Sequence, residues 1–389
     1  MTILSNEPEW TAEQVSLCAA CAKHPEVKAL VESDIAEGVC GACASSDAGV
    51  FNPARFGLLR NLIRALIRLH FNEEDYNGHW GGTSIDDILL NQKNPIIAVA
   101  TSPDYNDDLI HRITWEGEIY PDPDEGIWLY KGNDETGRLI QFSIPETRVS
   151  ELDDIERRLE RQNFHAVEPA MEALVARIEG DIAAAVPAGS RWYRGRIGVV
   201  EQVTHVGFNE ITRVAFPYKG AAIGALPPPQ ASAGRTNRHG VSVLYLASEI
   251  DTALAEIRPH PSHLISVAGF RARKDLRVAR FDLPIGPFAS SNTRLNLFAL
   301  IYHIDTLLSA PVIPEERHRY AATQLLADVL IRHGFEGVIY RSSVGSGINL
   351  CAFDPWAFEY DESNAAVKQV GRLHYHFSDV ATAIPTRGS

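Results

Sequence analysis

The sequence predicts an α+β protein, with a zinc-stapled, largely helical N-terminal region ahead of a C-terminal half of strands and short helices. Three observations predict this: two matched cysteine pairs near the N-terminus, a helical apolar repeat over residues 56–70, and a change from strand to helix periodicity over residues 241–257. The chain has 389 residues, of which 45% are hydrophobic and 22% charged, so we expect a globular protein of two or three domains.

The four N-terminal cysteines follow the spacing Cys18-x2-Cys21-x18-Cys40-x2-Cys43. In a reducing compartment, two Cys-x2-Cys knuckles are typical of a tetrahedral zinc site rather than of disulfides. Four thiolates close the coordination shell, so we expect a structural Zn²⁺ in a zinc-binding module at residues 1–50. A redox-active dithiol is the alternative. The fifth cysteine, Cys351, stands in an apolar run and is expected in a buried strand.

Residues 51–188 are expected to form a helical or mixed extension. Arg60, Arg64 and Arg68 recur every four residues against leucine and isoleucine, which predicts an amphipathic helix with a basic face. Arg64 and His70 also fit the loose Arg-x4–6-His ribonuclease signature of HEPN proteins, although charge on a helix face explains the same residues. Glycines and prolines between 117 and 137 predict short strands and turns over residues 101–147. Residues 151–185 are predicted to be helical, and we place the domain boundary at 187–190.

The stretch 241–257 predicts a strand that carries Tyr245, a tight turn and a short helix, because side chains first alternate and then repeat at a helical spacing. Ser248 is expected to cap this helix, with Asp251 at its third position. Glu256 lies at the border of the apolar stripe, so its carboxylate is expected to be partly buried beside Tyr245. On their own, the same residues also fit a surface glutamate and a core tyrosine. Further strands are predicted at 264–270, 276–281, 337–340 and 348–353, and a helix at 321–331.

Composition and missing motifs argue against several classes of function. A formal net charge of −14 does not favour general nucleic-acid binding. No apolar run approaches the roughly 20 residues of a membrane span, and the N-terminus lacks the features of a signal peptide, so a cytoplasmic location is expected. The sequence has no Gly-x-Ser-x-Gly elbow, Walker loop or dinucleotide-binding glycine motif after a strand.

Four short motifs follow one another in the second half of the chain. They are Tyr193-Arg194, Gly234-Arg-Thr-Asn237, the pair Tyr245 and Glu256 in Leu244–Ser248 and Ala253–Glu256, and Gly337–Ser342 followed by Asn349. In this order they resemble the RES-domain family, which is named for its arginine, glutamate and serine. The resemblance covers about 189–360, and it leaves 361–389 as a C-terminal tail. Thr236 stands where the family usually has an aromatic residue. Arg341 stands where the family has proline, which leaves the choice between Ser342 and Ser343 open.

The resemblance implies an ADP-ribosyltransferase-like fold with a mixed sheet, and an NAD⁺-degrading enzyme that acts as the toxin of a toxin–antitoxin pair. It also implies an inhibitory antitoxin and a possible homodimer, and the N-terminal half resembles a HEPN-like extension. Within such a site, the expected catalytic residues are Glu256, Tyr245, Arg194 and Ser342, and the expected NAD⁺-binding residues are Arg194, Arg235, Asn237, Tyr245 and Asn349.

Each of these residues has an expected role. Glu256 would stabilise the cation that forms when the nicotinamide–ribose bond breaks. Arg194 and Arg235 would bind phosphates, Tyr245 would stack on nicotinamide, and Ser342 would hydrogen-bond the carboxamide or ribose. Two other interpretations stay open: an ADP-ribosyltransferase that modifies a macromolecule through the same pocket, and a non-catalytic interaction module in which the cysteine module and the arginine helix bind a partner.

Overall fold

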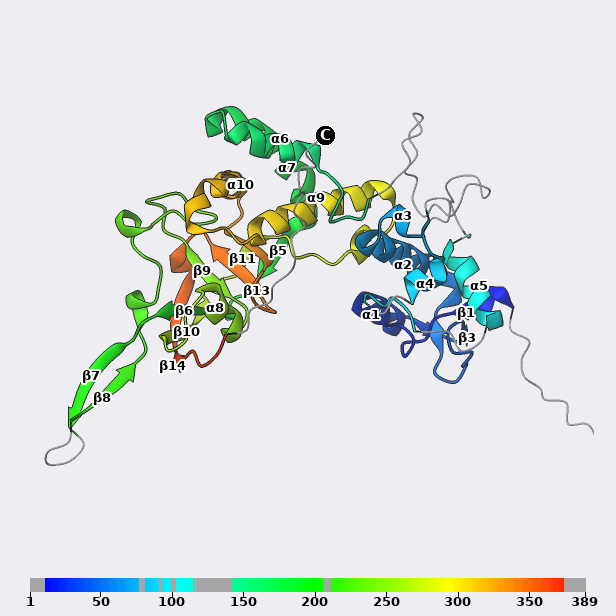
Figure 1. Ribbon diagram of the computed structural model, residues 1–389, viewed down its shortest axis with the longest axis horizontal. Coiled ribbons are helices and arrows are strands. Elements are labelled where there is room, and N and C mark those ends of the chain that lie inside the picture. Colours follow the sequence, from blue (N-terminus) through cyan, green and yellow to red (C-terminus); the bar gives the residue numbers. More distant parts are fainter. Residues whose placement is uncertain are drawn as a thin grey trace, which may run out of the picture. The chain divides into compact units, whose positions relative to one another are not determined.

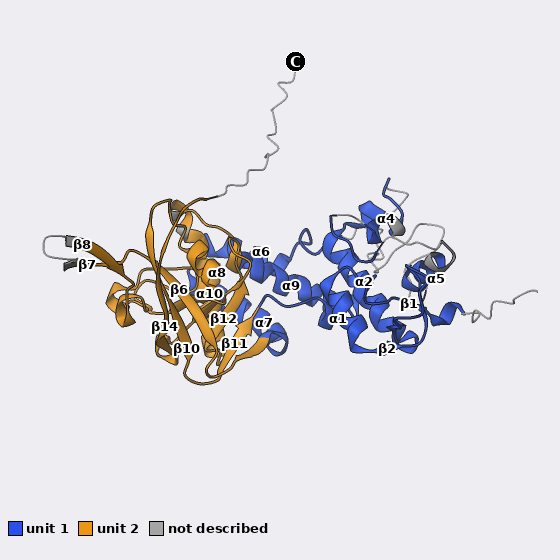
Figure 2. Ribbon diagram, turned by 90° about the horizontal axis from the view of Figure 1, so that it is seen from below, with its two compact units in different colours: residues 1–182, 281–307 blue, residues 183–280, 308–389 orange. Residues whose placement is uncertain are grey.

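The computed structural model describes residues 11–76, 81–90, 93–98, 103–114, 116, 142–205 and 211–373. The chain divides into two compact units (Figure 2). Unit 1 comprises residues 1–182 and 281–307, and unit 2 comprises residues 183–280 and 308–389. The second stretch of unit 1 therefore interrupts the sequence of unit 2.

Unit 1 is largely helical, as the sequence predicts. Its short strands lie around the cysteines: β1 (Val15–Ser16) pairs with β3 (Val39–Cys40), and β2 (Ile35–Ala36) pairs with β4 (Val50–Phe51). Its helices are α1 (Pro25–Ser33), α2 (Phe56–His70), α3 (Glu73–Tyr76), α4 (Ile85–Leu89), α5 (Pro103–Thr114), α6 (Ser150–Leu159), α7 (Phe164–Ile182) and α9 (Asn292–Ser309).

Two helices of unit 1, α5 and α9, differ from the sequence predictions. Helix α5 lies where short strands were predicted, so that interpretation is wrong for residues 103–114. The glycines and prolines between 117 and 137, on which it rested, lie outside the described residues. Helix α9 has no counterpart among the sequence predictions, because its apolar side chains do not gather on one face.

The predicted basic face of α2 is also wrong, because two of its arginines are buried. Arg64 is 5% exposed and Arg68 is 4% exposed. Arg64 donates to the carbonyl oxygens of Ile113 (2.6 Å) and Thr114 (3.0 Å), which belong to α5. Arg68 donates to Asn296 of α9 over 2.8 Å. These guanidinium groups therefore join helices of unit 1 instead of offering charge to a partner or a catalytic site.

Unit 2 is built on an eight-stranded mixed sheet with the order β14-β10-β6-β9-β13-β12-β11-β5 (Figure 1). β11 and β12 run parallel, and the other registered pairs in this sheet run antiparallel. The strands are β5 (Ala183–Val186), β6 (Arg191–Ile197), β9 (Leu244–Ala247), β10 (Leu264–Ala272), β11 (Leu276–Arg280), β12 (Gly337–Arg341), β13 (Ile348–Ala352) and β14 (Phe358–Gln369).

The remaining elements of unit 2 are two helices and a separate ribbon. α8 (Ile250–Glu256) follows β9, and α10 (Ala321–Arg332) precedes β12. β7 (Val200–His205) and β8 (Ile211–Phe216) form a two-stranded antiparallel ribbon. The predicted strands from 241 onward and the helix at 321–331 are confirmed. β5 begins before residue 189, and β14 continues past residue 360 to Gln369.

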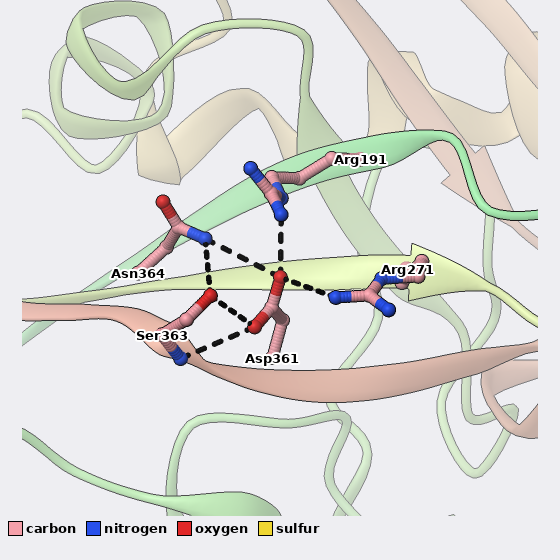
Figure 3. A network of polar contacts seen from close by, with 5 residues as sticks. All are labelled: Arg191, Arg271, Asp361, Ser363 and Asn364. Carbon is pink, nitrogen blue, oxygen red and sulfur yellow. Dashed lines mark hydrogen bonds and ion pairs between the residues drawn. The ribbon is translucent and has the colours of Figure 1, made fainter.

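A buried carboxylate joins three neighbouring strands at one end of this sheet (Figure 3). Asp361 of β14 is 7% exposed. It accepts hydrogen bonds from Arg191 of β6 and Arg271 of β10, both at 3.1 Å, and from the hydroxyl of Ser363 at 2.6 Å. These bonds, that of Ser363 first, hold the pKa of Asp361 well below its usual range. The edge strand is thereby fixed to its neighbours.

The sheet packs one face on an apolar core that includes Trp192, Leu246, Phe270 and Leu350. Cys351 is fully buried in β13, as predicted. Among the described helices, none has both the length and the apolar character that crossing a membrane requires.

Candidate active site

A cavity of about 410 Å³ lies in unit 2, over the central strands of the sheet. Three arginines and one carboxylate line it together with four tyrosines, which gives it a polar and aromatic wall. Its charged and aromatic lining residues are Arg194, Arg235, Arg258, Glu256, Tyr193, Tyr245, Tyr320 and Tyr340, and Asn349 completes the polar set. Of the predicted site residues in unit 2, the cavity brings together Glu256, Tyr245, Arg194, Arg235 and Asn349, whereas Ser342 and Asn237 are not among its lining residues.

Arg194 lies where two strands of the sheet separate. β6 pairs with β10 along its whole length, but it shares with β9 only the pair Tyr193 and Ala247. Beyond that pair, Arg194 Nη1 donates to the backbone oxygen of Tyr245 over 2.8 Å and so bridges the two strands. Its Nε is buried and has no hydrogen-bond partner among the described residues. Burial, followed by the charge of Arg196, lowers the pKa of Arg194, yet an arginine stays charged in proteins. A half-buried guanidinium that lines a cavity favours an anionic ligand.

Tyr245 has its hydroxyl occupied by the neighbouring loop. The hydroxyl donates to Asn237 Oδ1 (2.9 Å) and accepts from the backbone N–H of Thr236 (3.0 Å). Asn237, which was expected to bind NAD⁺, in turn donates to the backbone oxygens of Ser232 and Val241, both at 2.9 Å, so it shapes the loop. Burial raises the pKa of Tyr245, so the hydroxyl stays protonated at neutral pH. Only the ring of Tyr245 is then free for a ligand.

The loop that Tyr245 anchors carries Arg235. Arg235 Nη1 donates to the backbone oxygen of Ala310 over 2.8 Å, and its guanidinium lies 5.3 Å from the centroid of the Tyr320 ring. A Cβ at Gly234 would come within 2.5 Å of Asn237 Oδ1 and within 2.8 Å of the Tyr245 hydroxyl. Glycine is therefore required at this position, because the loop approaches the tyrosine so closely.

Glu256 is the last residue of α8 and is exposed, so the expectation of a partly buried carboxylate is wrong. Two donors nevertheless hold it. Asn349 Nδ2 donates to Glu256 Oε1 over 2.6 Å, and Ser342 Oγ donates to the same oxygen over 2.7 Å. Oε2 receives no hydrogen bond from the described residues. Of the two candidate serines, Ser342 is thus the one that contacts Glu256, whereas Ser343 is exposed.

The predicted capping role of Ser248 is wrong, because its hydroxyl has a different partner. The helix N-cap is Glu249, which makes no side-chain cap. Ser248 Oγ instead accepts from the backbone N–H of Ile348 over 3.0 Å, and Thr252 accepts from that of Gly347 over 3.0 Å. The side chains of Ser248 and Thr252 therefore both fix the loop that carries Ser342.

Sequence reasoning missed three residues of the cavity wall. Tyr340 ends the predicted strand at 337–340 and Tyr320 directly precedes the predicted helix at 321–331, and neither was expected in the site. Arg258 follows α8 with φ +46, in the left-handed region that non-glycine residues rarely adopt. Pro259 directly follows Arg258, and a charged residue forced into a turn beside Glu256 is a signal for a site.

The four N-terminal cysteines meet in unit 1 as predicted. Their Sγ atoms all lie within 4.8 Å of one another, and the sulfurs of Cys18 and Cys43 are 3.9 Å apart. Around a tetrahedral zinc ion with Zn–S bonds of about 2.3 Å, neighbouring sulfurs lie roughly 3.8 Å apart. Pairing of β1 with β3 brings the two knuckles together, because Ser16 lies opposite Cys40. This donor set fits a closed, structural zinc site.

Comparisons with known proteins bear on unit 2. The family model described as RES domain matches residues 210–376. A search of curated proteins finds no match. Among solved structures, the chain is similar to one from the crystal structure of the M. tuberculosis MbcT–MbcA toxin–antitoxin complex, with 12% identity, a TM-score of 0.28, and coverage of 51% of this chain and 93% of that chain. At these values we take nothing further from that likeness. Arg194 precedes the matched residues, but β6 belongs to the same sheet. Residues 210–376 of the chain are thus similar to the RES domain.

Proposed function

We propose that the protein is an NAD⁺-consuming enzyme that cleaves the bond between nicotinamide and ribose, and that it arrests growth in the cytoplasm by depleting NAD⁺. The observation that carries the proposal is the convergence of one oriented carboxylate, Glu256, with Arg194, Arg235 and Arg258 in a single cavity of a RES domain. The family resemblance supplies NAD⁺ as the expected substrate, and the charges of the cavity are compatible with it.

The cationic side chains suit a dinucleotide. Arginines such as Arg194 and Arg235 can each bind a phosphate through forked, charge-assisted hydrogen bonds. A volume of about 410 Å³ lies within the roughly 300–1,000 Å³ of small-molecule sites. The ring of Tyr245 offers a flat surface for the nicotinamide.

The proposed chemistry needs a negative charge beside the ribose. As the bond from C1′ to the nicotinamide nitrogen breaks, its electron pair leaves with neutral nicotinamide, and positive charge develops on the ribose. Glu256 Oε2 would stabilise that charge, while Oε1 is held by Asn349 and Ser342. Water, phosphate or a macromolecular nucleophile then attacks C1′ and releases the product.

The test measures nicotinamide release from NAD⁺ by the purified full-length protein, together with total NAD⁺ in bacteria that express it. Glu256→Gln keeps the shape and removes the charge, so we expect the rate to fall on the order of 10²–10³-fold. Asp251→Asn is the matched control, because Asp251 is an exposed carboxylate on the same helix and lies outside the cavity. Equal rates for wild type and Glu256→Gln would refute the proposal.

The fate of the ribose distinguishes cleavage from transfer. With NAD⁺ labelled in the adenylate, free ADP-ribose indicates hydrolysis and ADP-ribose 1″-phosphate indicates phosphorolysis. Label retained on protein or nucleic acid would indicate an ADP-ribosyltransferase instead. We also propose an inhibitory protein partner, because the family resemblance implies one and an NAD⁺-degrading enzyme needs restraint in its host. Zn²⁺ is proposed as a structural ion of unit 1, with no catalytic part.

A further inference from the structure

Asn349 is a buried polar residue beside an exposed carboxylate. It lies in β13, opposite Tyr340 of β12 and Ala247 of β9, and it is 6% exposed. The carboxylate of Glu256, in contrast, stands at the end of a short helix, where a long side chain keeps much of its rotational freedom. Of the two groups that meet at 2.6 Å, the amide on the sheet is therefore the fixed one.

Ser342 holds the same oxygen and has no capacity left for a ligand. It donates to Glu256 Oε1 and accepts from the backbone N–H groups of Val344 (3.2 Å) and Gly345 (3.0 Å). A hydroxyl has one proton and two lone pairs, so these contacts use all of them. Both donors thus act on Oε1, which leaves Oε2 of Glu256 for a substrate.

We propose that Asn349 is a positioning residue, whose buried amide holds Oε1 of Glu256 so that Oε2 faces the ribose of the substrate. The inference rests on the proposed function. It replaces the expectation that Asn349 binds NAD⁺ directly, and it assigns Ser342 the same positioning role. Asn349 lines the cavity as well, so direct substrate contact is the competing explanation.

Two variants of Asn349 separate these explanations in the full-length protein. Asn349→Leu removes the donor at similar volume. Because misplacing a reacting group by about 1 Å costs roughly 10²-fold, we expect kcat for NAD⁺ cleavage to fall about 10- to 100-fold while KM stays within about twofold. In a Glu256→Ala background the same substitution should change kcat by less than about twofold, since residues that act as a unit are not additive.

Asn349→Asp places a second carboxyl against Glu256, and like charges at this distance resist joint ionisation. We expect the acidic limb of its kcat profile to move to higher pH by about one unit or more. The other charged groups of the cavity are Arg194, Arg235 and Arg258, which stay protonated throughout, so the limb reports on the carboxyl pair. Unchanged near-UV circular dichroism in both variants checks the fold.

The outcomes are distinct. A raised KM with unchanged kcat in Asn349→Leu, or an equal loss in the Glu256→Ala background, overturns the inference and makes Asn349 a substrate contact or a structural residue. If the wild-type protein leaves NAD⁺ intact, the proposed function fails. In that case the contact between Asn349 and Glu256 is tested by titrating the ¹³C carboxyl resonance of Glu256. This resonance is identified because it is missing from the spectrum of Glu256→Gln. A higher titration midpoint in Asn349→Asp supports the contact, and an unchanged midpoint overturns it.

Discussion

Replacing Tyr245 with phenylalanine tests whether this residue acts in chemistry or in building the site. The substitution keeps the ring that lines the cavity and removes only the hydroxyl. That hydroxyl contacts Thr236 N (3.0 Å), Thr236 Oγ1 (3.0 Å) and Asn237 Oδ1 (2.9 Å). Thr236 and Asn237 directly follow Arg235, so loss of the hydroxyl should loosen the loop that holds the guanidinium.

The expected cost follows from the groups left without partners. Thr236 is 4% exposed, and its N–H has no other acceptor among the described contacts. Asn237 is 5% exposed, and its Oδ1 loses a donor. Each buried polar group left unsatisfied costs about 1–3 kcal/mol, so for two such groups we expect a loss of roughly 2–6 kcal/mol in the local stability of this loop. The KM for NAD⁺ should rise at least about tenfold through Arg235, with a smaller change in kcat.

Hydrogen exchange at the Thr236 amide measures this loss directly, without assuming that the two units unfold together. Tyr193→Phe is the control, since Tyr193 lines the same cavity but belongs to β6. Protection of the Thr236 amide should fall in Tyr245→Phe only. The reasoning fails if the amide stays protected, or if kcat collapses while KM and protection are unchanged, because the hydroxyl would then act on the substrate.

Two further predictions concern the zinc site and the sheet edge. Metal analysis should find about one zinc ion per chain, which is lost in Cys40→Ser but kept in Cys351→Ser. Loss of the ion should make hydrogen exchange faster over residues 15–51. Zinc that is retained in Cys40→Ser would contradict the assignment. The pKa of Asp361 is lower in the folded protein than in the unfolded chain, where it is about 3.9, so the ionised carboxylate stabilises the fold above that pH. This stabilisation is lost as the pH falls toward the pKa of Asp361 in the folded protein. Asp361→Asn should therefore be less stable than wild type at pH 7, and it should lose less stability between about pH 5 and 2; parallel urea-midpoint curves for the two proteins would rule out this role.

Local patterns predicted strands β9 to β13 of unit 2, because each of them buries most of its residues against its neighbours. Strands β5 to β8 and β14 had no counterpart among the sequence predictions. β12 and β13 are almost wholly buried, and their apolar runs mark them directly. The cysteine pairs were readable for a similar reason, since knuckle spacing is itself a local geometry. For Glu256 and Arg194, the ordered motifs indicated one site, and the cavity brings these two residues together.

Patterns failed where the deciding partner lies far along the chain. Arg68 resembles a surface charge on α2 until α9 supplies Asn296, which the sequence places more than 200 residues later. Ser248 fits a helix cap, but its hydroxyl accepts from Ile348 of β13. In both cases a buried donor or acceptor took the partner that tertiary packing offered, and the local preference was overridden. The contacts of Asn349 and Ser342 with Glu256 could not be predicted for the same reason, because neither residue is adjacent to Glu256 in sequence.

The cavity exists because a helix approaches the sheet at the point where two strands separate. A Cβ at Gly195 of β6 would lie 2.9 Å from the backbone oxygen of Ala253, so only glycine lets α8 come this close. That approach brings Glu256, at the end of α8, into the same cavity as Arg194, which bridges the gap between β6 and β9. Pro259 then ends the helix and leaves Arg258 with positive φ at the cavity wall. Backbone geometry thus brings the opposed charges of this site together, and the hydrogen bonds from Asn349 and Ser342 then hold the exposed carboxylate of Glu256.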